Sequence, residues 1–574
     1  MINLLYKTKS ILITTLLFSS INVHSSEVLP EPLNENDKNL YISIFSNQKD
    51  GDFQKANELI KKLENNILLG RVNAQKYLHP TGYISKFSEL KTWLSLYDDH
   101  PSASRIYWLS NRKKPKSANA AKKPEGGYLS GFGNADAITL RPRIPSSYSG
   151  RSAPSTTRQI AYKIRKYIRN SWPSGALDVL NKHSSRRVLT DKEESQLHWE
   201  IANAYFIFNK DYEAIREASK AIVITNGQND TAWLTAGLAS WRRSDFKRSR
   251  LFFSNLANLK NSRESIRSMG AYWASRAEFK NNNPKDAIKF LKISSKYPDT
   301  FYGKLAINAL GYNHNFNFEL PNISQGFINW LLSKEGGKRT FSLLQTSEFW
   351  HADRELRKLY SIVPEKYYLE YMSFASKYGM PSVSYRLADI QRVKTGIRWY
   401  GALYPDFPFD ESIEIEDKSL VMSIIRQESR FDQRGKSPAR AQGLMQILPS
   451  TAAFIMKNKN YRGKLRHDLL VPEKNIFIGE KYINHLLKEP LISGDLIKLL
   501  SAYNGGPGNL NKWLKRTNFN DDPLLLIETI PSRETRNYIK EVLKNLYMYN
   551  NKYKKDNQEF EKLASGYWKI QKRK

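Results

Sequence analysis

The 574-residue chain contains no cysteine. This absence excludes disulfide bonds, thiolate metal ligands, a cysteine nucleophile and a lipid-modified cysteine behind an export signal. A chain of this length does not need such cross-links, because it can bury enough apolar surface to be stable without them. The same length is too great for one ordinary core, so we expect two or three domains.

Acidic residues are scarce relative to basic ones. The chain has 56 Asp and Glu against 90 Lys and Arg, for a formal net charge of +34. Part of this excess can belong to an ordinary solvated surface. The functional alternative is attraction to a polyanion: nucleic acid, acidic lipid or a cell-wall polymer that bears carboxylates. Charge alone does not choose among these.

Long apolar runs are also missing, since no segment offers the roughly 18 unbroken apolar residues of a membrane-spanning helix. A short run from Ile11 to Ile21 follows Lys7 and Lys9 and ends near Ser25. A basic start, a short apolar core and small residues at the end are typical of a secretory signal peptide. We therefore predict a signal peptide over residues 1–25; the alternative is a buried N-terminal helix. Export makes nucleic acid an improbable partner.

The next two segments differ sharply in composition. Residues 27–110 show helical apolar spacing, which predicts an N-terminal helical region. Residues 111–157 are dominated by Lys, Pro, Gly and Ser. Such a composition indicates a basic linker or long exposed loop.

Residues 158–404 carry a loose helical repeat. Trp199, Trp233 and Trp273 each open a helix, a polar turn and a second helix, at intervals of 34 and 40 residues. This pattern predicts stacked hairpins similar to tetratricopeptide units, although the array is irregular. The stack could form a concave binding surface or serve only as a scaffold. Two prolines within Tyr404–Pro408 indicate a domain junction.

Glu428 lies at the end of an apolar helical stripe and is the strongest candidate for chemistry. Burial disfavours a carboxylate, so we expect the pKa of Glu428 to lie above the usual value of roughly 4.3. A carboxyl group that stays protonated near neutral pH can donate its proton to a glycosidic oxygen. Gly435 is the expected breaker that ends this helix. The buried face of the helix consists of Leu420, Val421, Ile424 and Ile425.

The motifs around Glu428, together with three later or earlier segments, resemble the soluble lytic murein transglycosylases. This resemblance implies a mainly all-α fold: an N-terminal α-superhelical solenoid of helical hairpins, followed by a lysozyme-like, α-rich catalytic domain over residues 405–560. Two positions depart from the family pattern, Arg440 where Gly is usual and Gly435 where Ala is common. The matching segments are Glu428-Ser429-x-Phe431, Ser437-Pro438-Ala439, Gly443-Leu444-Met445-Gln446-Ile447, Pro449-x-Thr451, Ala502-Tyr503-Asn504-Gly505-Gly506, Glu528-x-Ile530-Pro531-x-x-Glu534-Thr535-Arg536-x-Tyr538 and Phe301-Tyr302-Gly303.

The resemblance implies cleavage of the β-1,4 bond between N-acetylmuramic acid and N-acetylglucosamine without water. Glu428 would protonate the leaving oxygen and then, as a carboxylate, accept the proton of the muramyl C6 hydroxyl. The product would end in 1,6-anhydro-N-acetylmuramic acid. One glutamate suffices in this scheme, so we interpret the nearby Asp432 as a helix-end or turn residue.

The resemblance also implies a set of substrate-binding residues. Ser437 and Gln446 would bind the sugar by hydrogen bonds, and Met445 would pack the wall beneath it. Tyr503 should point its hydroxyl toward Glu428; the alternative is a core aromatic whose hydroxyl meets a backbone group. Asn504 should hold the adjoining turn.

Two residues of the C-terminal motif are less clear. Glu528 would either orient substrate amides or pair with an arginine such as Arg536. Tyr538 shares the apolar face of its helix with Ile539, Val542 and Leu546, which favours a mainly structural role.

Other kinds of site are poorly supported. The nine histidines form no metal-spaced pair, so we expect neither a metal nor another cofactor. The glycines at 505, 506 and 508 around Pro507 indicate a helix stop and a proline-started helix, not a phosphate loop.

Two further functions remain open beside transglycosylation. One is a hydrolytic muramidase on the same fold; the other is a non-catalytic scaffold that binds the cell wall. In each case the expected partner is the peptidoglycan glycan strand in the periplasm, with no nucleic acid and at most a peripheral membrane association. The cell-wall synthesis or secretion machinery is a further candidate partner.

Overall fold

The computed structural model describes residues 29–129, 155–184, 188–312, 316–409 and 413–565. The predicted signal peptide, residues 1–25, lies outside the described residues. Within these ranges the secondary structure is α-helical, with short 3-10 turns and two isolated β-bridges. The prediction of a mainly all-α fold is therefore confirmed. None of the helices in these ranges is long and apolar enough to cross a lipid bilayer.

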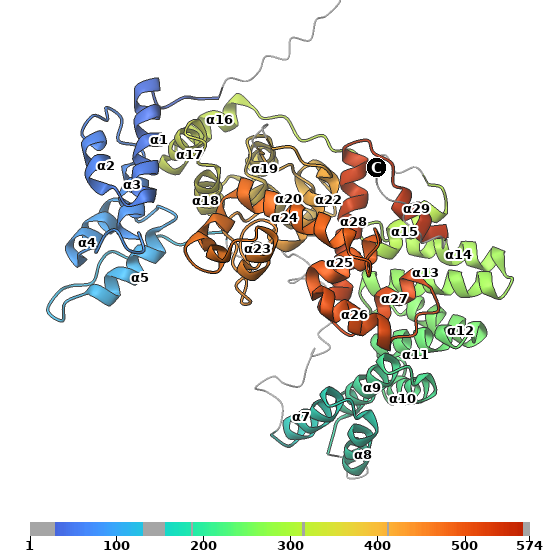
Figure 1. Ribbon diagram of the computed structural model, residues 1–574. Coiled ribbons are helices and arrows are strands. Elements are labelled where there is room, and N and C mark those ends of the chain that lie inside the picture. The colour runs from blue at the N-terminus through green and yellow to red at the C-terminus, as the bar shows by residue number, and fades with distance from the viewer. Residues whose placement is uncertain (1–28, 130–154, 185–187, 313–315, 410–412, 566–574) are drawn as a thin grey trace, which may run out of the picture.

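The N-terminal region forms a group of short helices on one side of the molecule (Figure 1). Asn34 caps the first helix by accepting from the Asp37 backbone, and Gly51 ends it in the left-handed conformation. The helices are α1 (Glu35–Asp50), α2 (Phe53–Ile60), α3 (Leu69–Tyr77), α4 (Phe87–Leu96) and α5 (Ala103–Lys113).

A curved stack of helices forms the other side of the molecule (Figure 1). Its helices are α7 (Ser155–Arg169), α8 (Pro173–Ser184), α9 (Asp191–Ile207), α10 (Asp211–Ile224), α11 (Asp230–Arg242), α12 (Phe246–Asn258), α13 (Glu264–Lys280), α14 (Pro284–Ser295) and α15 (Phe301–Ala309). The pairs α9–α10, α11–α12 and α13–α14 pack as hairpins. The turns of these hairpins hold Asn209, Ser244 and Asn282 at nearly the same left-handed φ, 60°, 60° and 61°. The three hairpins predicted from the tryptophan spacing are thus present.

After α15 the chain returns to the N-terminal helices (Figure 1). The returning helices are α16 (Gln325–Leu332), α17 (Glu335–Gln345), α18 (Phe349–Leu359), α19 (Tyr368–Lys377), α20 (Pro381–Thr395) and α21 (Tyr400–Leu403), with 3-10 turns at Tyr360–Ile362 and Glu365–Tyr367. Arg339 of α17 joins these returning helices to the N-terminal region. Its guanidinium lies 2.7 Å from Asp99 and 2.9 Å from the buried Glu355.

The C-terminal domain lies between the N-terminal helices and the curved stack (Figure 1). Its long central helix α28 packs against α22 and α25, while the last helix, α29, packs on α15. The elements are α22 (Lys418–Glu428), α23 (Pro449–Ile455), 3-10 turns at Lys459–Arg462 and Lys464–Leu470, α24 (Pro472–Lys488), α25 (Leu496–Gly505), α26 (Pro507–Arg516), α27 (Pro523–Thr529), α28 (Arg533–Lys552) and α29 (Gln558–Ser565). As predicted, α25 stops at the glycines and α26 starts at Pro507.

The segment expected to be a linker is partly anchored. Residues 114–129 contain no helix, yet they are fixed to α18 by hydrogen bonds. The Leu129 backbone NH donates to the Arg357 carbonyl at 2.8 Å, and Lys358 Nζ donates to the carbonyls of Glu125 and Gly126. Most of residues 114–129 are exposed, as expected of a linker or long exposed loop, but these hydrogen bonds anchor the segment to α18. The remainder, from 130 to 154, lies outside the described residues.

Candidate active site

Helix α22 places Glu428 at its last position. Asp417 starts the helix by accepting from the Leu420 backbone NH at 3.2 Å, and the predicted apolar face is buried. The chain then leaves the helix through Arg430 and Phe431, whose φ angles are 49° and 65°. These two non-glycine residues make the turn, so the prediction that Gly435 ends the helix was wrong.

Burial raises the pKa of the Glu428 carboxyl to about 8. The Tyr538 hydroxyl, on α28, opposes this effect and lowers the pKa, while the charge of Glu534 raises it further. The side chain is nevertheless only half-buried. A half-buried carboxyl group that keeps its proton at neutral pH can act as an acid on a ligand that reaches it.

Three tyrosines form a row beside Glu428. The rings of Tyr503 and Tyr538 are stacked, with centroids 6.4 Å apart and an interplanar angle of 4°, and Tyr482 lies 5.4 Å from Tyr503. The charge of Glu428 raises the pKa of both Tyr503 and Tyr538, after the larger effect of their burial. Two of these rings, those of Tyr503 and Tyr538, therefore lie close to the carboxyl group.

The Tyr503 hydroxyl is not directed as we expected. It donates to the backbone carbonyl of Met445 at 2.9 Å, which matches the alternative of a hydroxyl that meets a backbone group. Tyr503 still lies close enough to Glu428 to sense its charge. Its hydrogen bond thus holds the loop that carries Met445 against the aromatic row.

The loop from Gly435 to Ile447 is a compact, self-bonded turn. Gln442 bridges to both Lys436 and Ile447, and the Ser437 hydroxyl accepts from the Ala441 backbone NH at 3.0 Å. The Gln446 amide nitrogen donates to the carbonyls of Gly443 and Gly435 at 2.8 and 3.2 Å. Ser437 and Gln446 remain partly exposed, so their other polar atoms can meet a ligand.

A buried asparagine on α24 fastens this loop to the domain. Asn475 accepts from the Met445 backbone NH at 2.8 Å, and its amide nitrogen donates to the carbonyls of Gln442 and Leu469. Met445 is fully buried, as expected of a residue beneath the wall. Gly443 has a φ of 78°, and a Cβ there would lie 2.1 Å from the Leu469 carbonyl oxygen. Only glycine fits at this point.

The departure from the family pattern at Arg440 has a structural cost. Arg440 has a φ of 70°, in the left-handed region that glycine adopts freely. Its side chain is exposed and adds a positive charge to the turn beside Ser437. The left-handed backbone at position 440 explains why glycine is usual there. Nothing in this loop explains the arginine.

The Glu528 carboxylate has partners other than those expected. Its Oε1 accepts from the Tyr302 hydroxyl at 2.8 Å and from Lys540 Nζ at 2.9 Å. Arg536 instead donates to the Ile530 carbonyl. Glu528 is buried and joins α27 to α15 and α28, which favours a structural role. It also lines a cavity of about 1190 Å³, so its substrate-binding role stays a prediction.

The expected turn residues take the places assigned to them. Asn504 accepts from the Thr535 hydroxyl at 2.8 Å and so links the end of α25 to the start of α28. Asp432 accepts from its own turn, at the Arg434 backbone NH, and from the Trp350 indole of α18 at 3.2 Å. The interpretation of Asp432 as a turn residue is confirmed.

Sequence reasoning missed two neighbours of Glu428. Tyr538 was assigned a mainly structural role, and Glu534 was given none. The two lie one helical turn apart at the start of α28, so an i, i+4 spacing was the available signal. Among the residues that the structure describes, no group of three or more His, Cys, Asp or Glu is placed to hold a metal ion.

Comparisons with known proteins place this domain in a family. Residues 410–525 match the transglycosylase SLT domain. The chain is 40% identical over 129 residues to the soluble lytic murein transglycosylase of Salmonella typhimurium. This matched stretch covers 22% of this chain and 19% of that protein. It is 35% identical over 141 residues to a putative soluble lytic murein transglycosylase of Haemophilus influenzae, 24% and 23% of the two chains. The matched part thus spans about a fifth of these relatives.

The likeness of the fold extends further than that of the sequence. The X-ray structure of an inactive mutant of the lytic transglycosylase Slt from Pseudomonas aeruginosa matches 90% of this chain and 81% of its own, with a TM-score of 0.54 and 18% identity. This likeness concerns the fold alone, and it extends over the helical stack as well as the C-terminal domain. The motifs around Glu428 agree with the match of residues 410–525 to the transglycosylase SLT domain, and this part of the chain is similar to the corresponding part of the soluble lytic murein transglycosylases.

Proposed function

We propose that the chain is a peptidoglycan lytic transglycosylase. It cleaves the β-1,4 bond between N-acetylmuramic acid and N-acetylglucosamine and leaves a 1,6-anhydro-N-acetylmuramic acid end. The observation that carries this proposal is a single glutamate, Glu428, whose pKa is raised to about 8 by burial beside an aromatic row. Such a carboxyl group is protonated when it meets the substrate and can lose that proton to a leaving oxygen.

Both proton transfers can pass through the same carboxyl group. Glu428 gives its proton to the glycosidic oxygen as the bond from that oxygen to C1 breaks. The resulting carboxylate accepts the proton of the muramyl C6 hydroxyl while the C6 oxygen forms its bond to C1. Tyr538 lowers the pKa of Glu428, so its hydroxyl favours the carboxylate that exists between the two transfers. No water is consumed, and Glu428 ends protonated.

The proposed sugar-binding residues line the loop beside this group. Both hydrogens of the Gln446 amide are used within the loop, which leaves the amide oxygen as an acceptor for a sugar hydroxyl or NH. The Ser437 oxygen accepts from Ala441, which leaves its own proton free to donate. Met445, Tyr503 and Asn504 support these two from below and contribute shape rather than polar contacts.

A hydrolytic muramidase is the second candidate, and the charge of one neighbouring carboxylate favours it. The exposed carboxylate of Glu534 lies near enough to raise the pKa of Glu428. In hydrolysis, a second carboxylate would activate a water molecule on the other face of the sugar. Glu534 is the group that could do this, and Glu534→Gln would then abolish activity instead of altering its pH dependence.

The products separate these candidates. Purified sacculi are digested with the wild-type chain and with Glu428→Gln, and released muropeptides are analysed by mass spectrometry. Transglycosylation gives anhydro ends, lighter by one water than hydrolysed ends, and the variant releases none. Reducing ends would establish the muramidase. Sacculus binding by both proteins, without release by either, would establish a non-catalytic scaffold and overturn the enzyme proposal.

The remaining parts of the chain fit an exported wall enzyme. The predicted signal peptide, residues 1–25, would direct export of the mature chain to the periplasm. The carboxylates of the peptidoglycan there would attract a chain whose formal net charge is +34. We propose that residues 405–560 cut the strand and that residues 158–404 form the scaffold beside it. Association with cell-wall synthesis or secretion machinery stays a prediction.

A further inference from the structure

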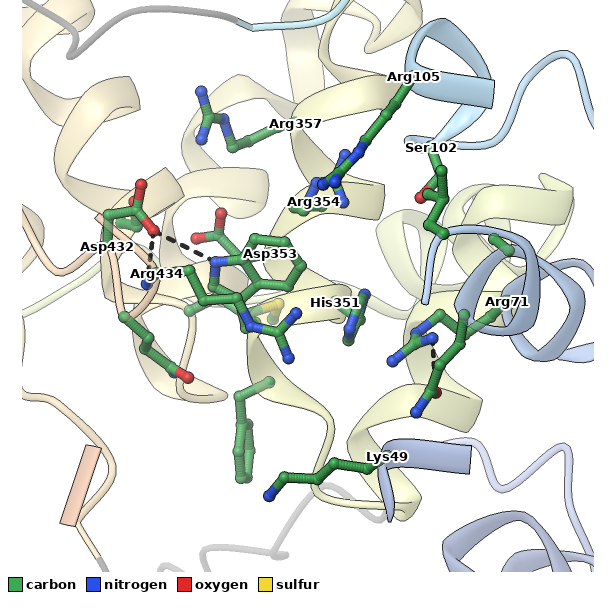
Figure 2. Close-up of a pocket in the computed structure, with 18 of the residues that line it drawn as sticks. Lys49, Arg71, Ser102, Arg105, His351, Asp353, Arg354, Arg357, Asp432 and Arg434 are labelled. Carbon is green, nitrogen blue, oxygen red and sulfur yellow. Dashed lines mark hydrogen bonds between the residues drawn. The ribbon is translucent and has the colours of Figure 1, made fainter. Parts of the chain in front are cut away.

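A basic cavity of about 740 Å³, whose lining does not include Glu428, lies where three parts of the chain meet. The N-terminal helices form one wall, α18 forms the floor, and the loop after α22 closes the other side (Figure 2). Figure 2 shows the side chains of Arg71 and Arg434 extending toward His351 from opposite sides, with Lys49 at the lower edge of the same view. The volume is that of a site for a small organic ligand rather than for a single ion.

Basic side chains outnumber acidic ones in the lining of this cavity. Three acidic side chains line it, and of these Asp353 and Asp432 are already hydrogen-bonded to the Val383 backbone NH and the Trp350 indole. Six basic side chains line the same cavity: Lys49, Arg71, Arg105, Arg354, Arg357 and Arg434.

These basic groups are poorly neutralised within the protein. Of the six, only Arg71 forms an ion pair with a carboxylate among the described residues, and that contact to Glu348 is long, at 3.7 Å. Arg354 and Arg357 donate to the backbone carbonyls of Pro101 and Leu129. Guanidinium groups without carboxylate partners are ready to bind an anion from outside.

The deep end of the cavity holds polar atoms that lack partners. Arg71 is 6% exposed and its Nε has no hydrogen-bond partner among the described residues. His351 is 8% exposed and its Nε2 has no hydrogen-bond partner there either, with the Glu348 carboxylate 3.6 Å away. A buried donor without a partner costs free energy, so such atoms are uncommon in folded proteins. A bound ligand that carries acceptors would satisfy both.

The basic groups also sense one another across the space. Burial lowers the pKa of Arg71 to about 10; Glu348 opposes this, and Arg434 and Arg354 lower it further. Burial likewise lowers the pKa of His351, and the same three arginines add to that effect. Groups that repel one another in this way bind an anion more tightly, because it relieves several repulsions at once.

One aromatic side chain organises two of the arginines. Arg434 and Arg354 lie over the ring of Trp350, with guanidinium carbons 4.3 and 4.8 Å from its centroid. The ring holds their planar forks in place, and planar forks match the geometry of carboxylate and phosphate. Apolar neighbours such as Leu78 and Met380 complete the lining and suit a ligand with a carbon body.

We propose that this cavity binds a small organic ligand that carries at least two oxyanion groups, carboxylate or phosphate. The ligand would contact α3, α18 and the loop after α22, and so join the N-terminal region to the segment that follows Glu428. The proposal does not depend on glycan cleavage, since none of the lining groups named here takes part in that reaction.

The test is calorimetric titration of the full mature chain at constant ionic strength with three probes. Inorganic pyrophosphate represents phosphate ligands, citrate represents polycarboxylates, and a disaccharide tetrapeptide represents the carboxylates of peptidoglycan stems. We expect saturable binding of at least one probe. The probe that binds identifies the source of the oxyanions.

The deciding variant is the double substitution Arg105→Gln with Arg434→Gln. Both side chains are exposed at the rim and come from different walls, so the fold should tolerate their loss. Loss of two charged hydrogen bonds should weaken binding by about tenfold or more. The matched control is Arg112→Gln with Arg248→Gln, which removes the same charge from exposed helical positions outside the cavity and should leave the affinity within about twofold.

Two results would overturn the proposal. One is the absence of saturable binding for all three probes. The other is equal weakening by the deciding variant and its control, which would show attraction to the general positive charge of the chain. Either outcome leaves the muropeptide products of Glu428 untouched, so failure here is distinct from failure of the proposed function.

Discussion

Two substitutions beside Glu428 should move the pH dependence of activity in opposite directions. Burial raises the pKa of Glu428, the charge of Glu534 raises it further, and the Tyr538 hydroxyl lowers it. Glu534→Gln removes a raising influence, so the alkaline limb of the activity profile should shift to lower pH. Tyr538→Phe removes the lowering influence and keeps the ring stacked on Tyr503, so the limb should shift to higher pH.

The size of the wild-type effect follows from the pKa of about 8. Glu428 would be about nine-tenths protonated at pH 7 and about one-tenth protonated at pH 9, so activity should fall about tenfold between them. A glutamate with an ordinary pKa of roughly 4.3 would be about one part in 500 protonated at pH 7. Its activity would already fall above pH 5.

The assay is the initial rate of anhydro-muropeptide release from sacculi, measured from pH 5 to 10 at constant ionic strength. Glu541→Gln and Tyr547→Phe are matched controls, because both residues lie on α28 and neither contributes to the pKa of Glu428. Shifts of the two test variants in the same direction would refute the reasoning, as would an unmoved limb in both. A wild-type limb below pH 6 would show that Glu428 is not buried as described.

The other substitutions test stability and backbone strain. The pKa of Glu428 is higher in the folded state than in the unfolded state, so the free energy of unfolding should fall as pH rises from about 4.5 to about 8. Glu428→Gln should flatten this pH dependence. Calorimetry at pH 9 should then show a Tm higher by about 2–5 °C for the variant. Glu528→Ala leaves Lys540 without its carboxylate partner and should lower the free energy of unfolding in urea by about 2–4 kcal/mol. The KM for sacculi should stay unchanged. A raised KM in a variant of full stability would instead support the substrate role of Glu528. Arg440→Gly removes the backbone strain of a left-handed non-glycine residue and should raise the free energy of unfolding by about 0.5–1 kcal/mol. An unchanged free energy of unfolding would mean that the exposed arginine side chain makes compensating contacts.

Local patterns in the sequence predicted the local features of the site. The i, i+4 row that ends at Glu428 anticipated both the helix and the raised pKa, because helix periodicity and burial are properties of a short segment. The glycine signals at the end of α25 worked for the same reason. The tryptophan spacing anticipated the hairpins, since each hairpin is one repeat long.

Contacts between distant segments were out of reach. Glu528 meets Tyr302, which precedes it by 226 residues, and no spacing rule connects α27 to α15. The left-handed turn at Arg430 and Phe431 was missed because neither is a residue that favours such a conformation. Tyr538 lies on an apolar helix face, and only the packing of α28 on α22 turns its hydroxyl toward Glu428.

These distant contacts imply that the C-terminal domain depends on the curved stack of helices. Asp522, at the start of α27, accepts from the Trp241 indole and pairs with Arg276, both at 2.9 Å, and Glu528 accepts from Tyr302 at the end of the same helix. Residues 413–565 produced alone would leave both carboxylates facing solvent or apolar surface without these partners. We expect α27 and the start of α28, which carries Tyr538, to exchange amide hydrogens faster in the isolated domain than in the full chain. Equal protection in both would show that the domain holds its site unaided and that the superhelix serves another purpose.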